Sequence, residues 1–378
     1  MRLDALTLMR KLLSFNTINP PGDERVCAHY LGELLETAGY ETRYYEFADK
    51  RSTLIARLAG SSDKLPICFT GHLDTVPLGA TPWARDPFAG ETDGDKLFGR
   101  GTSDMKSGVA AIVLMALRLA CLANRQAGLT LILTAGEETV CEGAKYVAGL
   151  AGALGQAGAI VVGEPSANAP YLAHKGCVRY AVKFKGAAAH SSTPEQGDNA
   201  IYKAAAAIRK LAGFDFDLPA HPFLGKPTLA VTMIEGGTAI NMIPAAAAIR
   251  VDIRTLPGQS ETEVHKSLAA LLGADVELRR LDGAASVGTD ENHEWVRQVF
   301  TIMEKLSGKR PAPAGATYFT DCSVFTPAYG KPPTIILGPG EPEMAHRTDE
   351  YCCLSKIELA VDAYSEIARR WCDLPGLT

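Results

Sequence analysis

Five residues of the types that bind metal ions come shortly after an apolar run or just before an expected helix. They are His72, Asp104, Glu138, Glu164 and His346. The apolar runs have the composition of buried strands, and Asp104 lies in GRGTSDMKSG, directly before a helical pattern. In open parallel sheets, sites form in the crevice beyond the carboxyl ends of the strands. We therefore expect these five side chains to converge in one crevice.

Each of these residues also has an ordinary interpretation when it is taken alone. A histidine after a strand is commonly a loop residue, aspartate favours the N-cap of a helix, and a glutamate after a strand is commonly solvated. Gathered together, three carboxylates would repel one another, and at least one would be driven to bind a proton. Two divalent cations and one hydroxide balance the three negative charges. Imidazole and carboxylate ligands without thiolates therefore favour a hydrolytic site with two zinc ions, for which cobalt or manganese can substitute.

Two kinds of neighbour support the expected ligands. Asp74 follows His72 by two residues, so in an extended segment its carboxylate can reach the imidazole and orient the ring. The alternative is a turn aspartate before Pro77. In TAGEETVCEG, Glu137 and Glu138 are adjacent carboxylates that ought to repel each other. We expect one to bind metal and its neighbour to face the substrate as a proton carrier, because the cation offsets the repulsion.

The elements that must position these residues alternate between strand and helix. Buried parallel strands are predicted at Leu65–Thr70, Leu129–Ala135 and Ala159–Val162, and helices at Ser107–Ala120 and from Glu142 to about Leu150. This alternation predicts an α/β fold, with a mostly parallel sheet flanked by helices.

From about His174 the pattern changes to that of a split, ferredoxin-like βαββαβ unit. The expected elements are a strand at Cys177–Lys185, a helix at Asn199–Leu211, strands at Thr228–Glu235 and Ala246–Arg254, a helix at Glu261–Leu272 and a strand at Val276–Arg280. The first pattern then returns with a helix at His293–Leu306, a strand at Thr334–Leu337 and a helix at Leu354–Trp371. We expect a catalytic domain of residues 1–173 and 284–378, interrupted by a smaller domain of residues 174–283.

Composition excludes several classes of protein. The 378 residues are 47% hydrophobic, enough to bury a large core, and a net charge of −5 gives no electrostatic footprint for nucleic acid. The sequence contains no run of eighteen uncharged apolar residues, so no membrane span is predicted. The N-terminal segment has the spacing of an amphipathic helix and lacks a signal-peptide cleavage site. Nine cysteines without a CxxC pair predict reduced thiols in a cytoplasmic protein.

Five motifs in order resemble one known family. They are GHLDTVP (71–77), GRGTSDMKSG (99–108), AGEET (135–139), GEPS (163–166) and a late AH (345–346). The chain is similar, over nearly its whole length, to the metallopeptidase family of acetylornithine deacetylase, succinyl-diaminopimelate desuccinylase and glutamate carboxypeptidase. The resemblance implies that His72 and Glu164 hold one zinc ion, that Glu138 and His346 hold the other, and that Asp104 bridges them.

The resemblance also implies a mechanism. Glu137 matches the family's general base, and Asp74 matches its histidine-orienting aspartate. Two metal ions about 3.5–4 Å apart would lower the pKa of a bridging water, from which Glu137 takes a proton that it later gives to the departing amine. The interrupting domain resembles the family's lid and dimerisation domain, which implies a homodimer through residues 174–283. A role in amino-acid biosynthesis follows from the same resemblance.

Residues outside the metal site carry expectations about the substrate. His190, in the interrupting domain, matches a histidine that enters the partner subunit's site and stabilises the oxyanion. Arg254 and Asn241 match residues that bind the substrate's α-carboxylate. Thr320 and Gly338 are expected to line the pocket. The ordinary alternatives are a loop histidine, an arginine in a surface salt bridge and an asparagine in a turn.

Three functions are consistent with these observations: an N-acyl-amino-acid amidohydrolase, a zinc carboxypeptidase or dipeptidase, and a binding protein that keeps the fold without catalysis. The segment Ala316–Phe325 lacks the glycine-rich, basic form expected of a desuccinylase. Within it, Asp321 suits either a substrate ammonium group or a capped turn. GHLDTVP, RDPF and LGPG favour the acetylornithine deacetylase side. Retention of the base together with every ligand argues against the non-catalytic protein.

Overall fold

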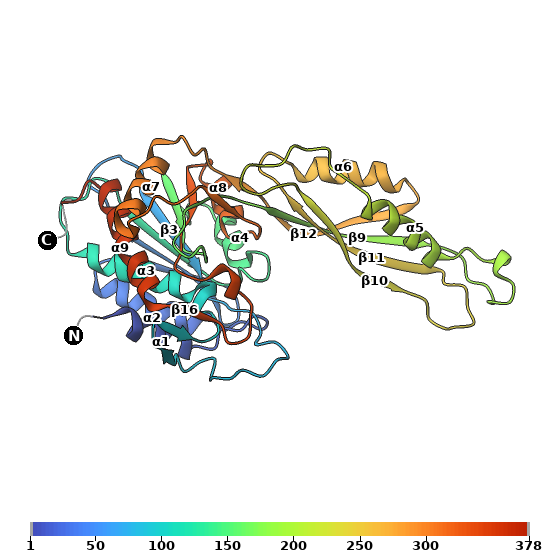
Figure 1. Cartoon of the computed structure of the whole chain (residues 1–378), viewed down its shortest axis with the longest axis horizontal. Helices are drawn as coiled ribbons and strands as arrows, with labels where there is room; N and C mark the ends of the chain where they lie inside the picture. Colours follow the sequence, from blue (N-terminus) through green and yellow to red (C-terminus); the bar gives the residue numbers. More distant parts are fainter. Residues whose placement is uncertain (1–2, 376–378) are drawn as a thin grey trace. The chain divides into compact units, whose positions relative to one another are not determined.

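The computed structural model describes residues 3–375, which form two compact units (Figure 1). Unit 1 contains the residues up to Ala173, Gly288–Gly315 and those from Thr320 onward. Unit 2 contains His174–Val287 and Ala316–Phe319. The expected division of the chain into a catalytic domain and a smaller domain of residues 174–283 stays a prediction. Within residues 3–375, no helix has the length and apolar character needed to cross a membrane.

Unit 1 is built on a mixed sheet with a parallel centre. The central strands pair in parallel in the order β6 (Leu129–Thr134), β3 (Ile67–His72), β7 (Ala159–Val162) and β15 (Thr334–Ile336). Their side chains are buried throughout, which is why they read as continuous apolar runs in the sequence. The predicted α/β class with a parallel sheet core is confirmed.

Antiparallel strands extend the sheet on both sides, so that the sheet as a whole is mixed. Next to β6 lie β2 (Arg51–Leu58) and β1 (Glu41–Ala48), and next to β15 lies β8 (Tyr171–His174). The order continues from β8 to β13 (Val287–Gly288), and β14 (Ala314–Ala316) also pairs with β8. A second, three-stranded sheet contains β16 (Tyr351–Cys353), β5 (Lys96–Phe98) and β4 (Thr92–Asp93).

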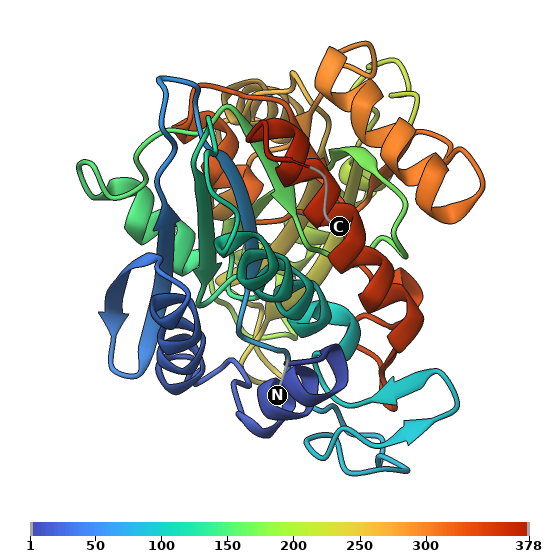
Figure 2. The same cartoon turned by 90° about the vertical axis from the view of Figure 1, so that its left-hand side faces the viewer.

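Helices cover both faces of the central sheet. Right-handed crossovers from β3 to β6 and from β6 back to β7 run in opposite directions along the sheet, so they place α3 and α4 on opposite faces. Figure 2 shows α3 and α9 side by side across one face. The helices of unit 1 are α1 (Ala5–Ser14), α2 (Arg25–Thr37), α3 (Ser107–Ala120), α4 (Glu142–Gly149), α7 (Glu294–Ser307), α8 (Cys322–Ala328) and α9 (Leu354–Trp371).

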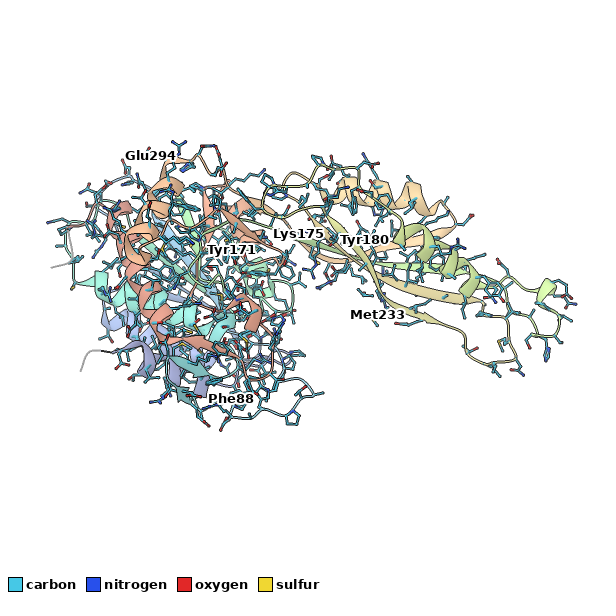
Figure 3. The ribbon with its side chains drawn as sticks, in the orientation of Figure 1. Phe88, Tyr171, Lys175, Tyr180, Met233 and Glu294 are labelled. Carbon is cyan, nitrogen blue, oxygen red and sulfur yellow. The ribbon has the colours of Figure 1, made fainter. Side chains whose placement is uncertain are left out.

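Unit 2 is a four-stranded antiparallel sheet in the order β10-β11-β9-β12. Its elements follow the predicted βαββαβ order: β9 (Gly176–Lys185), α5 (Ala200–Ala212), β10 (Thr228–Gly236), β11 (Ala246–Thr255), α6 (Glu261–Leu272) and β12 (Val276–Ala284). Buried and less buried side chains alternate along β11, and Ile249 and Val251 pack with Leu268 of α6 in the core. Tyr180 of β9 and Met233 of β10, both in unit 2, are labelled in Figure 3.

Candidate metal centre

The ends of three parallel strands bring the predicted residues together. His72 is the last residue of β3, Glu137 and Glu138 follow β6 by three and four residues, and Glu164 follows β7 by two. Because these strands run in parallel, their carboxyl ends lie at one edge of the sheet. The strand that was predicted to end at Thr70 extends to His72, so this histidine belongs to the sheet rather than to the loop.

Asp104 lies between the two histidines. Its Oδ1 is 3.1 Å from Nε2 of His72, and its Oδ2 is 3.3 Å from Nε2 of His346. His346 Nε2 is also 3.1 Å from Oε1 of Glu138. On the other side, His72 Nε2 is 3.7 Å from Oε1 of Glu164. One carboxylate is therefore shared between two groups, each with one histidine and one glutamate.

The spacing of ligand atoms fits a cation in this crevice. One atom each from His72, Asp104 and Glu138 lie within 4.8 Å of one another, and so do atoms from His72, Glu137 and Glu164. Such distances allow atoms on different sides of an ion to bind it at about 2.0–2.2 Å. The ligand set is imidazole and carboxylate only, which suits zinc, cobalt or manganese. The residues therefore fit divalent metal binding.

The N-cap alternative for Asp104 is wrong. Helix α3 begins at Ser107, and Lys106 occupies its N-cap position. Asp104 lies inside the turn Thr102–Lys106 with non-helical backbone angles, φ −118° and ψ 94°. Its carboxylate instead faces the two histidines, and its side chain is only 13% exposed.

Asp74 makes more contacts than its position in the sequence suggested. Nδ1 of His72 lies 3.0 Å from the backbone carbonyl oxygen of Asp74, and 3.5 Å from its carboxylate. The carboxylate also accepts hydrogen bonds from the backbone N–H groups of Glu137 (3.1 Å) and Glu138 (3.2 Å). Asn19 donates to it as well, at 2.9 Å. Asp74 thus holds the turn that carries both glutamates, while its backbone orients His72.

Burial and crowding shift the pKa values of the glutamates. Burial, followed by repulsion from Glu164, raises the pKa of Glu137 well above its usual value. Burial raises the pKa of Glu164 to about 8 against the attraction of His72. Burial also raises the pKa of Glu138, and Asp104 adds to the rise. With protein groups alone around them, these three neighbouring carboxyl groups resist ionisation. Divalent cations stabilise the ionised carboxylates in such an environment.

The histidines respond in the opposite direction. Burial lowers the pKa of His72, but Glu164 and Asp104 outweigh it, and the net shift is well upward. Hydrogen bonds that the His346 ring donates to the carboxylates of Asp104 and Glu138 raise the pKa of His346 to about 10. Positive charge is therefore strongly favoured at both positions, whether it is carried by protons or by metal ions.

Two further predicted residues of unit 1 are packed close to this crevice. Thr320 is buried, and its Oγ1 accepts a hydrogen bond from the Cys322 N–H at 3.2 Å. At Gly338, a Cβ atom would lie 2.2 Å from the carbonyl oxygen of Gly163, so only glycine fits against the loop that carries Glu164. Their contact with substrate stays a prediction.

Asp321 is buried, and its carboxylate accepts a hydrogen bond from the Thr134 hydroxyl at the end of β6. Burial raises the pKa of Asp321 to about 6. Its side chain makes no capping hydrogen bond to α8. It therefore supports the strand that leads to Glu137, which neither sequence-based interpretation anticipated.

The remaining predicted residues lie in unit 2. His190 has an exposed side chain, with Nδ1 2.7 Å from the Ser192 hydroxyl. Arg254 donates from Nε to Asp252 at 2.8 Å, and its guanidinium lies over the Phe319 ring. Asn241 is exposed, and its backbone carbonyl oxygen accepts a hydrogen bond from the Ser191 N–H at 3.0 Å. The roles of these residues toward substrate stay predictions.

Sequence reasoning missed the residues that support the ligands from distant parts of the chain. Asn19 bridges Asp74 and the Thr139 hydroxyl, and Glu350 accepts hydrogen bonds from the loop that carries Asp104. Asn19 precedes two prolines in NPPG, and this local motif is the sequence signal that could have drawn attention to the segment.

Comparison with known proteins agrees with this geometry. Residues 68–370 match the model of peptidase family M20/M25/M40. The chain is 31% identical over 362 residues to an acetylornithine deacetylase of Proteus mirabilis, covering 90% of this chain and 89% of the relative. It is 33% identical over 322 residues to an acetylornithine deacetylase of Erwinia tasmaniensis, covering 81% and 80% of the two chains.

Solved structures share the fold at lower identity. An M20 family metallo-carboxypeptidase of Sulfolobus solfataricus superimposes with a TM-score of 0.81 at 18% identity, covering 98% of this chain and all of that chain. A dinuclear metal-binding peptidase of the same family from Bacillus subtilis gives a TM-score of 0.75 at 18% identity, covering 98% of each chain.

Proposed function

The chain belongs to peptidase family M20/M25/M40 and is a metal-dependent amidohydrolase, and on that premise we propose that it hydrolyses the amide bond of an N-acyl amino acid. The reaction would release acetate and a free amino acid, as in acetylornithine deacetylation. One observation carries the proposal: the Asp104 carboxylate is shared between a His72–Glu164 group and a His346–Glu138 group. This arrangement suits two metal ions bridged by one carboxylate.

The proposed metal ions are two zinc ions, and cobalt or manganese would fit the same ligands. His72 and Glu164 would hold one, Glu138 and His346 the other, with Asp104 between them. When bound, cations in such a site polarise the amide carbonyl and lower the pKa of a bound water toward neutral, so that hydroxide is available as the nucleophile.

Glu137 is suited to move the proton in this reaction. Its side chain is buried, and its Oε1 has no hydrogen-bond partner within residues 3–375. The Asp74 carboxylate fixes its backbone through the Glu137 N–H. We assign Glu137 the role of general base toward the attacking water and of general acid toward the leaving amine nitrogen.

We also propose roles toward the substrate for residues of unit 2. Arg254 and Asn241 are proposed to bind the substrate's α-carboxylate, and His190 to stabilise the oxyanion. In unit 1, Thr320 and Gly338 are proposed to line the acyl-amino-acid pocket. The guanidinium of Arg254 is already oriented by Asp252, which reduces the entropy lost when it binds a carboxylate.

We propose a homodimer formed through residues 174–283. Strand β10 is an edge strand of the unit 2 sheet, and large apolar side chains stand exposed on it and beyond it, at Met233, Ile234, Ile240 and Met242. An exposed edge with apolar side chains is a surface that a second copy can cover. A cytoplasmic location is proposed as well, since all nine cysteines are free thiols.

A kinetic panel tests the proposed reaction. The zinc-loaded protein would be assayed with N-acetyl-ornithine, N-succinyl-diaminopimelate, acyl-glutamates and simple dipeptides. We expect the highest kcat/KM with an N-acetyl amino acid. Preference for a dipeptide or for a peptide C-terminus would contradict the proposal and favour a carboxypeptidase or dipeptidase. Preference for the succinyl substrate would favour a desuccinylase.

A further inference from the structure

Glu350 is a fully buried carboxylate whose four hydrogen-bond donors all belong to the segment that ends at Asp104. Its Oε1 accepts from the backbone N–H groups of Ser103 at 2.7 Å and Asp104 at 2.9 Å. Its Oε2 accepts from the Gly101 N–H at 3.0 Å and from the Arg100 guanidinium at 2.7 Å. The side chain of Glu350 is 0% exposed, so water cannot replace these bonds without opening the core.

Apart from these bonds, the segment Thr102–Lys106 is held by a single kinked turn, which the Lys106 N–H closes by donating to the Gly101 carbonyl oxygen. Asp104 and Met105 have non-helical backbone angles, and α3 begins only at Ser107. Without Glu350, the N–H groups of Ser103 and Asp104 would lack these partners, and a backbone amide that is left unpaired away from water is unfavourable. One of the two amides belongs to Asp104 itself. Glu350 therefore acts directly on the backbone that carries the shared ligand.

Arg100 connects Glu350 to the backbone of the residue that follows the second histidine. Nη1 of Arg100 donates to Glu350 and also to the backbone carbonyl of Arg347 at 3.1 Å, one residue after His346. Nη2 donates to the Pro77 carbonyl at 3.1 Å, in the segment after His72 and Asp74. Arg100 is 1% exposed, so the ion pair is a buried and rigid connection between three loops of the site.

We propose that Glu350, together with Arg100, is a positioning residue that holds Asp104 and His346 at the spacing needed for metal binding. This inference rests on the proposed function, because it assumes that both residues are metal ligands. Glu350 touches neither of the two ligand side chains in these contacts. It acts through the backbone, as residues that support metal ligands commonly do, and loss of such support typically weakens metal affinity 10–100-fold.

The test is Glu350→Gln, compared with Glu341→Gln as a matched control. Glutamine places an NH2 group where one carboxylate oxygen was, so two donors would face a donor in either orientation. Glu341 is also buried, at 5% exposed, and its carboxylate pairs with Lys356 at 2.7 Å rather than with a ligand loop. The measurement is cobalt and zinc affinity of the full chain, by competition with a chromophoric chelator and by the visible spectrum of bound cobalt.

We expect Glu350→Gln to weaken binding of at least one metal ion 10–100-fold and to change the cobalt spectrum, while Glu341→Gln stays within threefold of wild type. The rise in unfolding temperature on adding zinc should also shrink in Glu350→Gln. Wild-type affinity and spectrum in Glu350→Gln, with an equal drop in unfolding temperature with and without zinc, would overturn the inference.

Two further measurements keep the outcome decisive. If Glu350→Gln does not fold, Glu350→Asp serves in the same assay, because its shorter carboxylate keeps the charge but cannot span all four donors. Wild-type protein is titrated in parallel. Failure of the wild type to bind two cobalt ions would overturn the proposed function, whereas unchanged binding in both Glu350 variants beside a two-metal wild type would overturn only the positioning role.

Discussion

At the scale of single residues, two adjacent glutamates have different surroundings, which fits the different roles that we propose for them. Glu138 lies 3.1 Å from the His346 ring nitrogen, in the group that shares Asp104. Glu137 is buried with one oxygen unpartnered within residues 3–375. Both backbones are held by Asp74, so the two side chains are fixed in different directions from one turn. Their adjacency is tolerable because cationic charge is favoured beside them.

Substitution of each glutamate should therefore have a different consequence. Glu137→Gln should keep both metal ions and lower kcat by about 10²–10⁴-fold, because proton transfer is lost. Glu138→Gln should lower metal occupancy, because a carboxylate ligand is replaced by an amide. Metal content per chain and steady-state kinetics, measured on the same preparations, separate the two effects. Normal turnover by Glu137→Gln would show that another residue is the base.

Removing the Asp74 carboxylate should disturb the turn rather than His72 alone. In Asp74→Asn, the amide keeps one acceptor for two backbone donors, and the buried Asn19 amide loses a charged partner. We expect kcat to fall at least tenfold, with weaker metal binding as well. Asn19→Ala should reproduce a smaller part of this loss, and full activity of Asp74→Asn would contradict the assigned role.

His174 provides a pH test away from the metal ligands. It is buried, and burial lowers its pKa from 6.5 to about 4. Between these values the unfolded chain binds more protons than the folded one, so stability is present above pH 6.5 and is lost as pH falls toward 4. From pH 7 to 5 the loss from this group should be about 2 kcal/mol.

The measurement is the free energy of unfolding of His174→Asn relative to wild type, at pH 7 and pH 5. The difference between the two proteins should narrow at the lower pH by about 2 kcal/mol. His265→Asn, at an exposed position of α6, is the control for replacing a histidine on the surface. A difference between His174→Asn and wild type that is the same at both pH values would contradict the assignment.

Much of the ligand set was predictable from the sequence, and its support was not. His72, Glu138 and Glu164 follow apolar strands, so their convergence follows from a parallel sheet. Glu350 contacts residues nearly 250 positions earlier, through backbone amides that no spacing rule reveals. Strand periodicity predicted that the Asp74 carboxylate faces His72, and it lies 3.5 Å from the ring nitrogen, but the closer contact of that nitrogen is with the Asp74 backbone carbonyl, because β3 ends at His72.

At the scale of elements, close packing of α3 on the end of β7 places Asp104 beside Glu164. A Cβ atom on Gly108, in the first turn of α3, would lie 2.0 Å from the carbonyl oxygen of Gly163. The helix can approach the strand end this closely only with glycine at this position. Gly108, the last residue of the motif GRGTSDMKSG, is thus required for the packing of α3 against the end of β7.

Gly108→Ala should therefore separate α3 from the Glu164 loop. We expect a loss of about 1–3 kcal/mol in stability, accompanied by weaker metal binding. Gly149→Ala is the matched control, because α4 ends there with nothing within 4 Å of the added methyl group. Its stability should be unchanged or higher by up to about 1 kcal/mol. Chemical denaturation of both metal-free variants, followed by zinc titration, gives the comparison.

Elements were predictable where a continuous apolar run or a helical period marks them. β7, α3, α6 and α9 have the predicted ends, because continuous apolar runs and helical periodicity mark them. β1 and β2, which extend the sheet antiparallel, were not predicted. β1 is half-exposed along its length, and its polar residues conceal the strand. The strands of the small sheet are two or three residues long, too short for periodicity to detect.

At the scale of the whole molecule, all five proposed metal ligands belong to unit 1, whereas His190, Asn241 and Arg254 belong to unit 2. Chemistry and substrate recognition are thus assigned to different parts of the chain. The exposed edge strand β10 is the surface of unit 2 that we propose a second copy covers. The proposed dimer therefore has a catalytic consequence if His190 serves the partner's site.

Mixing two inactive variants tests that consequence. His190→Ala and Glu137→Gln should each have little activity alone. After subunit exchange, hybrid dimers would contain one site with both Glu137 and a partner histidine, so activity should recover to about a quarter of wild type when half the dimers are hybrids. Absence of recovery, despite hybrid dimers detected by mass spectrometry, would place His190 in its own subunit's site or outside catalysis.

The most direct test of the central claim is an anomalous difference map of zinc-saturated crystals, collected at the zinc absorption edge. We expect two peaks, one beside His72 and Glu164 and the other beside Glu138 and His346, with the Asp104 carboxylate between them. No peak in this crevice, or a single peak that leaves His346 or Glu164 uncoordinated at full zinc occupancy, would contradict the two-metal site.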